Sequence, residues 1–118
     1  MQFSESLKKN HQFQFVFKNG KSYGNKYLVM YVKENGLGIN RLGIVVSKKV
    51  GNSVVRHRVT RLVRESYRLH ESIFNSGLDI VIVARPSAAT VGYFEVESAL
   101  LHLAKLQKII KVFFYWDN

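Results

Sequence analysis

The apolar residues near the start of the chain recur with the spacing of a helix. Phe13, Val16 and Phe17 fall on one side of a helix drawn over Lys8–Asn19, and Asn10 is a possible N-cap residue. We therefore predict a short first helix over this range.

Two longer stretches carry the same helical period. One is Ser53–His70, with Asn52 or Ser53 as its N-cap. Five of its apolar side chains fall in one arc and are expected to bury against a sheet: Val55, Val59, Leu62, Val63 and Leu69. The other stretch, Gly92–Lys111, begins with glutamates and ends with lysines, the charge order that the helix dipole favours.

Three segments rich in β-branched and aromatic residues predict strands: Tyr27–Lys33, Leu42–Ser47 and Leu78–Arg85. An Asn-Gly dipeptide at positions 35 and 36 separates the first two, so we expect them to pair as an antiparallel hairpin. The third is largely apolar and stops at Pro86, which predicts a central strand covered on both faces.

These elements predict one α+β domain spanning residues 1–118. A chain of 118 residues is long enough to bury a single core without disulfides or metal. The simplest arrangement is an α/β sandwich in which three helices pack on a sheet, in the order helix, hairpin, helix, strand, helix.

The charge balance points to a polyanionic partner. Lys and Arg number 18 against 8 Asp and Glu, so the net charge is +10. Nucleic acid is the first interpretation and an acidic membrane surface the second. The chain has no cysteine, which excludes disulfide frameworks, thiolate zinc sites and cysteine nucleophiles.

Neither a targeting signal nor a membrane span is evident in the sequence. The first residues lack the apolar core of a signal peptide, and no apolar run approaches the ~20 residues of a spanning helix. We expect a soluble, cytoplasmic protein. The aromatic tail Val112–Trp116 is predicted to pack on the sheet or on the third helix, with a partner-binding patch as the alternative.

The helix predicted over Ser53–His70 carries a stripe of positive charge. Opposite the apolar arc, four side chains follow at helical spacing: His57, Arg61, Arg64 and Arg68. Arg56 and Arg58 flank the stripe. Lys48 and Lys49 extend it toward the helix N-terminus, which itself attracts anions.

A solvated helix face is the ordinary explanation for such charges, but it usually mixes both signs. Here Glu65 is the one acid nearby, and it lies to one side. All five strong cations of the helix are arginines, whose planar fork suits phosphate contacts and stacking on bases. The stripe therefore predicts nucleic-acid binding.

The run SKKVGNSVVRHRVTRLVR, from Ser47 to Arg64, resembles the signature of the protein subunit of bacterial ribonuclease P, which is close to S-K-K-x-G-N-A-V-x-R-N-R-x-K-R-x-x-R. His57 stands where that family has asparagine, and Thr60 where it usually has lysine.

The resemblance extends beyond this run. Residues 7–20 are similar to the family's opening helix, and residues 84–86 to the end of its last strand, so the match covers most of the chain. It implies a mixed four-stranded sheet in the order α-β-β-β-α-β-α. It also implies a short extra strand near Ser22–Tyr23 and a left-handed crossover between parallel strands.

The resemblance also implies a function. The chain would be the small partner of a catalytic RNA that holds magnesium and removes the 5′ leader of precursor tRNA, with no small-molecule substrate. The residues implied to contact that RNA are Lys48, Lys49, Asn52, Arg56, His57, Arg58, Arg61, Arg64 and Arg68. The leader would lie in a cleft lined by Phe13, Phe17, Val29, Tyr31 and Ser47.

The aromatic residues of this cleft have a physical basis of their own. Phe13 and Phe17 lie one turn apart on a helix, and Val29 and Tyr31 share one face of a strand, so the four could offer stacking surfaces to unpaired bases. The alternative is that Phe13 and Phe17 are ordinary core residues.

Catalysis by the chain alone is not expected. A metal nuclease gathers carboxylates around its ions, whereas the eight acids here are scattered and the four histidines lack ligand spacing. Two other functions remain open: a ribosomal or general RNA-binding protein, and a protein that binds membrane surfaces through its basic face. The lack of bulky apolar residues among the arginines argues against membrane insertion of that helix.

Overall fold

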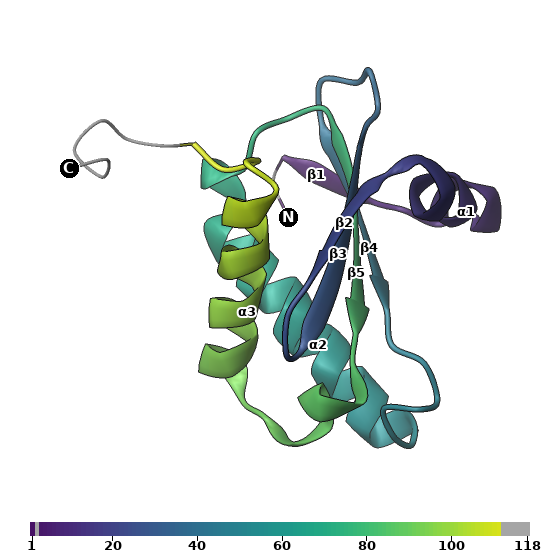
Figure 1. The fold of residues 1–118 in the computed structure, drawn as a ribbon, viewed down its shortest axis with the longest axis vertical. Coiled ribbons are helices and arrows are strands. Elements are labelled where there is room, and N and C mark those ends of the chain that lie inside the picture. Colours follow the sequence, from purple (N-terminus) through teal and green to yellow (C-terminus); the bar gives the residue numbers. More distant parts are fainter. Residues whose placement is uncertain (2, 112–118) are drawn as a thin grey trace.

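Three helices and five strands make up the fold of residues 1 and 3–111, which the computed structural model describes (Figure 1). In chain order they are β1 (Ser4–Ser6), α1 (Asn10–Asn19), β2 (Lys21–Gly24), β3 (Leu28–Glu34), β4 (Asn40–Val45), α2 (Ser53–His70), β5 (Leu78–Ala84) and α3 (Tyr93–Leu106), with two short 3-10 helices at Glu71–Ile73 and Pro86–Thr90. The tail Val112–Trp116 lies outside the described residues.

The five strands form one mixed sheet in the order β1-β4-β5-β3-β2. The predicted hairpin between β3 and β4 is wrong, because β5 lies between them, antiparallel to β3 and parallel to β4. Six of the seven residues of β5 are buried, so its apolar sequence places it at the centre of the sheet, as predicted. The Asn-Gly segment instead packs on the loop before β5, where the Asn35 amide donates to the Gly77 carbonyl at 2.9 Å.

The α+β class is confirmed, but the sheet has five strands rather than four. The additional strand, β1, pairs in parallel with β4. It escaped sequence analysis because it has three residues, all of them polar. Its position is fixed from outside the sheet by a 2.7 Å hydrogen bond between the Ser4 and Tyr67 hydroxyls. The short strand implied near Ser22–Tyr23 is present as β2, and α2 connects the parallel strands β4 and β5.

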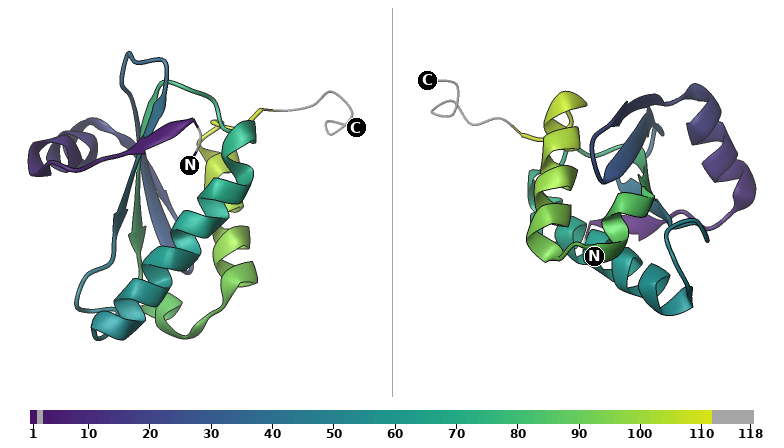
Figure 2. Two further views of the ribbon diagram at one scale, coloured as in Figure 1. Left: turned by 180° about the vertical axis from the view of Figure 1, so that it is seen from behind. Right: turned by 60° about the horizontal axis from the view of Figure 1, so that its bottom comes forward.

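The helices cover the two faces of the sheet unequally. Helices α2 and α3 pack side by side on one face, and α1 crosses the other (Figures 1 and 2). The larger core lies under α2 and α3, where Met30 and Ile82 of the sheet contact a layer that includes Val63 and Leu100. A smaller cluster of Leu7, Val16 and Val81 lies under α1. The face beneath α1 is therefore only partly covered.

Two predicted helix boundaries are wrong. Helix α1 begins at Asn10 and not at Lys8, with Lys9 as its N-cap; Gln12 accepts hydrogen bonds from the Lys8 and Lys9 amides, so Asn10 is not needed as a cap. Helix α3 ends at Leu106 rather than Lys111. The following residues turn back, and Ile110 forms a bridge with Phe74.

A buried ion pair joins β4 to β5. The Arg41 guanidinium donates from Nε and Nη2 to the two Asp79 carboxylate oxygens, each at 2.7 Å, and these hydrogen bonds raise the pKa of Arg41 above its ordinary value. Asp79 is 4% exposed and also accepts from the Asn35 side chain at 2.9 Å. The pair thus fixes the β3–β4 connection against the start of β5.

The end of α3 is closed by a hydrogen-bonded turn with a lysine in an unusual conformation. The Lys108 amide donates to the Lys105 carbonyl, and the Ile109 amide donates to the Ala104 carbonyl, at 3.0 and 3.2 Å. This is the Schellman pattern, whose left-handed residue is usually glycine. Lys108 occupies that position with φ of 58° and is the one non-glycine residue with positive φ among those described.

We expect Lys108→Gly to stabilise the fold. Glycine adopts positive φ without the steric cost that a side chain carries there, so the free energy of unfolding should rise by about 1 kcal/mol. Urea denaturation of the two proteins measures the difference. An unchanged or lower midpoint would mean that the lysine side chain makes stabilising contacts that outweigh its backbone strain.

Candidate nucleic-acid interface

Helix α2 holds the predicted cationic stripe in a fixed orientation. It begins where predicted, because the Asn52 side chain accepts a hydrogen bond from the Val55 amide at 3.0 Å and caps the helix. Two of its own residues, Val59 and Val63, are fully buried in the core. Ser53–His70 is therefore anchored along one side, and the opposite side faces solvent.

The predicted buried arc is correct except at its end. Val55 and Leu62 pack against the core with partial exposure, but Leu69 is 54% exposed. Tyr67 takes the buried place instead, and burial raises the pKa of its phenol. A helical projection put Leu69 within the apolar arc, but Tyr67 lies against the sheet edge, where Ser4 and Asn40 supply hydrogen-bond partners for its hydroxyl.

Three side chains of the stripe are exposed and unpaired. Among residues 1 and 3–111, His57, Arg61 and Arg64 have no hydrogen bond or ion pair through their side chains. Because Arg61 and Arg64 lie on the outer face of a helix packed firmly on the sheet, their charges are presented to solvent with their full hydrogen-bonding capacity. Thr60, beside them, is half-buried.

The other arginines of α2 make contacts within the fold. Arg58 donates from Nη1 to the Val91 carbonyl at 2.8 Å and from Nη2 to the Ala89 carbonyl, which ties α2 to the segment before α3. Arg56 donates to the Gly51 carbonyl at 3.1 Å. The role of Arg58 depends on the position of a distant loop, so sequence analysis did not predict it.

Arg68 is the one stripe residue with an acidic partner. Its guanidinium contacts the Glu65 carboxylate at 2.5 and 2.9 Å, and the hydrogen bond from Arg68 lowers the pKa of Glu65. Both side chains are nearly half exposed. Part of the Arg68 charge is thus neutralised within the helix.

Lys48 and Lys49 extend the basic surface beyond the helix. Both are exposed in the turn that follows Ser47, where the Val50 amide donates to the Ser47 carbonyl at 3.0 Å. Val50 is buried and anchors the turn. Residues 46–52 leave β4 on the side of the sheet that carries α1 and then pass to the start of α2 (Figure 1).

The predicted aromatic surface lies on the α1 side of the sheet. Phe17 and Tyr31 meet edge to face with ring centroids 4.9 Å apart. Phe13 packs closely over Gly43, where an added Cβ would collide with the Phe13 ring. The structure thus brings α1 and β3 residues together as predicted.

The residues of the predicted cleft are partly exposed. Phe13, Phe17, Val29 and Tyr31 are all half-buried, so they cover the sheet and also present surface to solvent. Val45 and Val83 extend the same apolar face and were missed by sequence analysis. They pair in register with each other across β4 and β5, and Val83 also pairs with Val29, a placement that follows only from the strand order.

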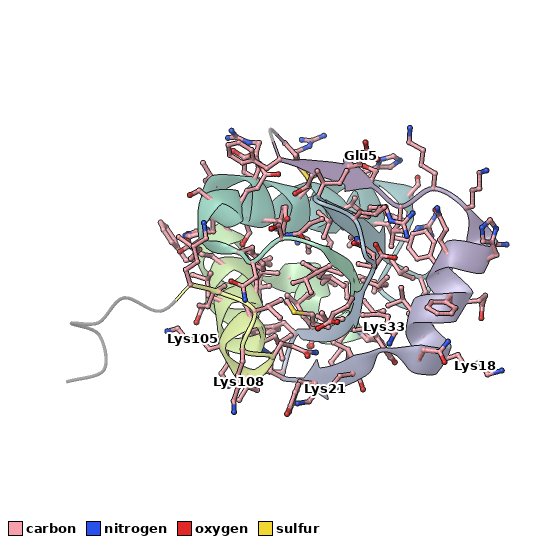
Figure 3. The ribbon with its side chains drawn as sticks, turned by 90° about the horizontal axis from the view of Figure 1, so that it is seen from above. Glu5, Lys18, Lys21, Lys33, Lys105 and Lys108 are labelled. Carbon is pink, nitrogen blue, oxygen red and sulfur yellow. The ribbon has the colours of Figure 1, made fainter. Side chains whose placement is uncertain are left out.

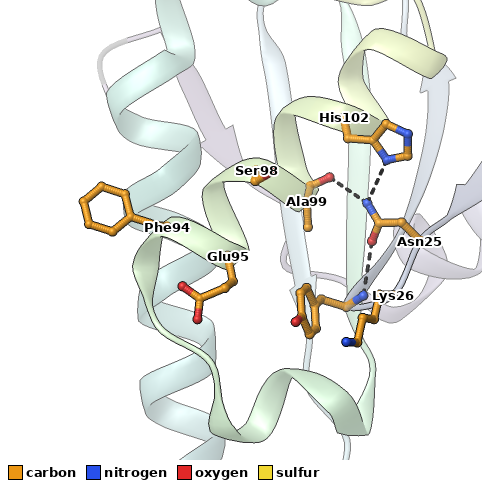
Figure 4. Close-up of a pocket in the computed structure, with 8 residues that line it drawn as sticks. Asn25, Lys26, Phe94, Glu95, Ser98, Ala99 and His102 are labelled. Carbon is orange, nitrogen blue, oxygen red and sulfur yellow. Dashed lines mark hydrogen bonds between the residues drawn. The ribbon is translucent and has the colours of Figure 1, made fainter.

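A separate hollow of about 410 Å³ lies between α3 and the β2–β3 turn (Figure 4). Asn25 bridges the two elements, since its side-chain nitrogen donates to the Ala99 carbonyl at 2.9 Å and lies 3.2 Å from His102 Nδ1. The lining combines Lys26 with Glu95 and therefore lacks the uniform charge of the α2 stripe. It was not foreseen from the sequence.

Two further properties bear on what the site does chemically. Within residues 1 and 3–111, no three His, Asp or Glu side chains gather as a metal-ion site. In the same part of the chain, no helix is both long and apolar enough to cross a membrane. The features that stand out are thus the cationic face of α2 and the aromatic face beside α1.

Comparison with known proteins gives one consistent result. Residues 1–108 match the family model for ribonuclease P. The ribonuclease P protein component of Lachnoclostridium phytofermentans is 71% identical over 107 residues, covering 91% of this chain and 92% of the relative. That of Alkaliphilus metalliredigens is 52% identical over 110 residues, covering 93% and 99%.

Solved structures agree with the sequence relatives. The RNase P protein of Staphylococcus aureus superposes with a TM-score of 0.83 at 36% identity, covering 90% of this chain and 97% of that one. The RNase P protein from Thermotoga maritima gives 0.79 at 36% identity, covering 86% and 96%.

Proposed function

Because the chain belongs to the family of bacterial ribonuclease P protein subunits, we propose that the exposed face of α2 binds the catalytic RNA and that the aromatic face beside α1 binds the 5′ leader of precursor tRNA. Family membership makes the chain the RNA-binding accessory subunit of an endoribonuclease that matures tRNA. The assignment of residues to each RNA partner is the proposal.

The observation that carries the proposal is the pair of free guanidinium groups on α2. Arg61 and Arg64 are exposed, lack partners among the described residues, and project from a helix whose opposite side is buried. Arginine forks donate paired hydrogen bonds to phosphate oxygens, and an unpaired surface of one sign gains most from a polyanion. We define the arginine surface as Lys48, Lys49, Asn52, Arg56, His57, Arg61, Arg64 and Arg68.

Arg58 is given a different role from its neighbours. Its two hydrogen bonds to backbone carbonyls hold α2 against the segment before α3. We propose that Arg58 positions the arginine surface and contributes to RNA binding chiefly through its charge.

The aromatic face is suited to an unpaired strand. Unpaired bases stack on aromatic rings without strict sequence requirement, whereas paired bases hide their faces. Phe13, Phe17 and Tyr31 supply such rings, with Val29 beside them, and Ser47 lies in the turn that leads to the arginine surface. A leader on this face would thus enter near the RNA bound to α2.

Hydrolysis is assigned to the RNA. We propose that the RNA holds the magnesium ions, since the described part of this chain offers no cluster of three acidic or histidine ligands for them. The chain would act by binding and orienting the two RNAs. As the partner of bacterial RNAs, it is proposed to work in the cytoplasm.

Single-turnover cleavage of a leader-bearing precursor tRNA tests the function. A bacterial ribonuclease P RNA would be assayed at low magnesium with and without this protein, beside the protein alone. Strong stimulation of the RNA and no cleavage by the protein are expected. Tight RNA binding without stimulation would favour the alternative of a general RNA-binding protein.

Removing one ring from the aromatic face should affect leader-bearing substrate selectively. We expect Phe17→Ala or Tyr31→Ala to weaken binding of precursor tRNA by about 10-fold, because loss of base stacking costs about 1–3 kcal/mol per base. Binding of leaderless tRNA to the same holoenzyme should change little.

Phe15→Ala is the matched control for this prediction. Phe15 also lies on α1 but is 54% exposed and does not belong to the cluster under that helix. Its replacement should leave leader preference unchanged. Equal losses with leader-bearing and leaderless tRNA in the Phe17 and Tyr31 variants would argue against a leader site on this face.

A further inference from the structure

A second group of lysines lies on the side of the molecule away from α2 (Figure 3). Five lysines from three separate parts of the chain gather there, and we call them the lysine surface: Lys18, Lys21, Lys33, Lys105 and Lys108. They come from the end of α1, from the edge strand β2 and its neighbour β3, and from the end of α3. The lysine surface thus lies around the β2 edge of the sheet, away from α2.

Three of these lysines surround a hollow of about 510 Å³. Lys21, Lys33 and Lys108 line it together with polar groups that include Asn19 and Asn75. Glu34 is the single acidic residue in the lining. The hollow therefore combines a net positive charge with neutral hydrogen-bonding groups, the combination that phosphate oxygens require.

The backbone beneath the lysine surface is firmly fixed. Gln107 is 8% exposed, and its side-chain nitrogen donates to the Lys21 carbonyl at 2.9 Å and to the Met30 carbonyl at 3.0 Å. These bonds hold the end of α3 against β2 and β3. Because Lys21 is paired with Val32, it lies beside the residue that precedes Lys33. Residues that are far apart in the sequence thus line the same hollow.

No internal anion balances this surface. Within residues 1 and 3–111, none of the five lysines takes part in a salt bridge, and the nearby Asp79 carboxylate is occupied by Arg41. Lys105 and Lys108 follow the usual preference for cations at helix C-terminal ends, and so does Lys18. Lys21 and Lys33 lie on strands, where that explanation does not apply.

The conformation of Lys108 supports a role for its side chain. At this turn glycine would avoid the cost of positive φ, yet the residue is a lysine that lines the hollow. A strained backbone is characteristic of positions kept for their function.

We propose that the lysine surface is a second RNA-binding site, which takes the phosphate backbone of an RNA segment different from the one on the arginine surface. The choice of RNA as the polyanion rests on the proposed function. Lysines act as point charges and lack the planar fork of arginine, so the site should bind the backbone without reading its sequence. The protein would then lie between two RNA segments.

Replacing the three lysines of the hollow tests the site. The variant Lys21→Gln, Lys33→Gln, Lys108→Gly would be titrated with the catalytic RNA of a bacterial ribonuclease P over a range of salt concentrations. We expect at least a 10-fold weaker complex and a salt slope lowered by about 2, since each neutralised phosphate contributes roughly 0.7–0.9 to that slope. Glycine at position 108 should not impair folding, so the weaker complex would report on binding.

The matched control removes three lysines elsewhere. Lys8→Gln, Lys9→Gln, Lys26→Gln changes the net charge equally but at exposed positions outside the lysine surface. It should weaken the complex by clearly less than the test variant. Equal losses in the two variants would reduce the effect to net charge and overturn the proposal, as would an unchanged affinity in the test variant.

Site-directed cleavage of the RNA separates this proposal from the function on which it rests. The chain has no cysteine, so Arg61→Cys and Lys105→Cys each create a single attachment point for an iron chelate that cuts nearby RNA. Cleavage of different RNA segments from positions 61 and 105 is expected. Cleavage from position 61 alone would overturn the second site, and cleavage from neither would count against the proposed function itself.

Discussion

Replacing Arg61 and Arg64 together by alanine is expected to weaken the complex with the catalytic RNA by about 100-fold at low salt. Each charged hydrogen bond to a phosphate contributes about 1.5–3 kcal/mol, and about 1.4 kcal/mol corresponds to a factor of ten. Both side chains are exposed and unpaired within residues 1 and 3–111, so their removal breaks no hydrogen bond of the described fold. The thermal stability of the free protein should therefore be unchanged.

Filter binding or fluorescence titration at several salt concentrations measures this effect. The slope of log affinity against log salt should fall by about 1.5, because each neutralised phosphate contributes roughly 0.7–0.9 to it. Lys8→Ala with Lys9→Ala removes the same charge from the start of α1 and serves as the control. If that control weakens binding as much as the arginine variant does, then net charge and not the α2 face determines RNA binding.

Single variants distinguish the unpaired arginines of α2 from those that make contacts within the fold. Arg68 is held by Glu65, and Arg58 donates to the Ala89 and Val91 carbonyls. Arg68→Ala should therefore weaken RNA binding less than either Arg61→Ala or Arg64→Ala. Arg58→Ala should reduce the stability of the protein as well, because it releases the segment before α3.

Replacing Arg41 by alanine is expected to lower the free energy of unfolding by about 3 kcal/mol. The Asp79 carboxylate is 4% exposed and would keep the Asn35 side chain as its one remaining hydrogen-bond donor among the side chains described. Breaking a buried ion pair typically costs about 3–5 kcal/mol, since the other charge is left without compensation. We expect the lower end of this range because the Arg41 side chain is 24% exposed, so water can replace part of its interaction with Asp79.

Urea denaturation checks this prediction, with Arg68→Ala as the control. That variant breaks the pair with Glu65, which lies at the surface, and exposed pairs contribute little. Its denaturation midpoint should therefore stay close to that of the unchanged protein. The double variant Arg41→Ala, Asp79→Ala should be more stable than Arg41→Ala, because it removes the uncompensated charge. If Arg41→Ala and Arg68→Ala lower the free energy of unfolding equally, burial of the Asp79 carboxylate does not explain how much its ion pair stabilises the protein.

Local pattern was sufficient for the elements that bury one continuous apolar face. Helix α2 begins and ends at the predicted residues; Asn52 caps it, and Val55, Val59 and Val63 repeat every four positions. The central place of β5 followed from its apolar sequence for a similar reason. Arg61 and Arg64 are exposed because the same helical period places them opposite the buried valines.

Pattern failed where the deciding contact came from a distant part of the chain. The Asn-Gly segment favours a hairpin locally, but the apolar strand β5 lies between β3 and β4, where nearly all of its residues are buried. Strand β1 has no apolar pattern at all and exists through its hydrogen bonds to β4 and Tyr67. Leu69 was predicted to be buried but is exposed, whereas Tyr67 is buried where the sheet edge offers hydrogen-bond partners to its hydroxyl group.

The sequence by itself determined the fold class, the α2 helix and the positive charge that favours a polyanionic partner, since these depend on composition and on periods of a few residues. The tertiary structure alone decided which arginines are free and which are tied, that Phe17 meets Tyr31, and that Lys21, Lys33 and Lys108 share one hollow. These facts depend on strand order and on contacts between residues far apart in the chain. Such contacts leave no repeating pattern in the amino-acid sequence. They stabilise the protein only once the whole sheet has assembled.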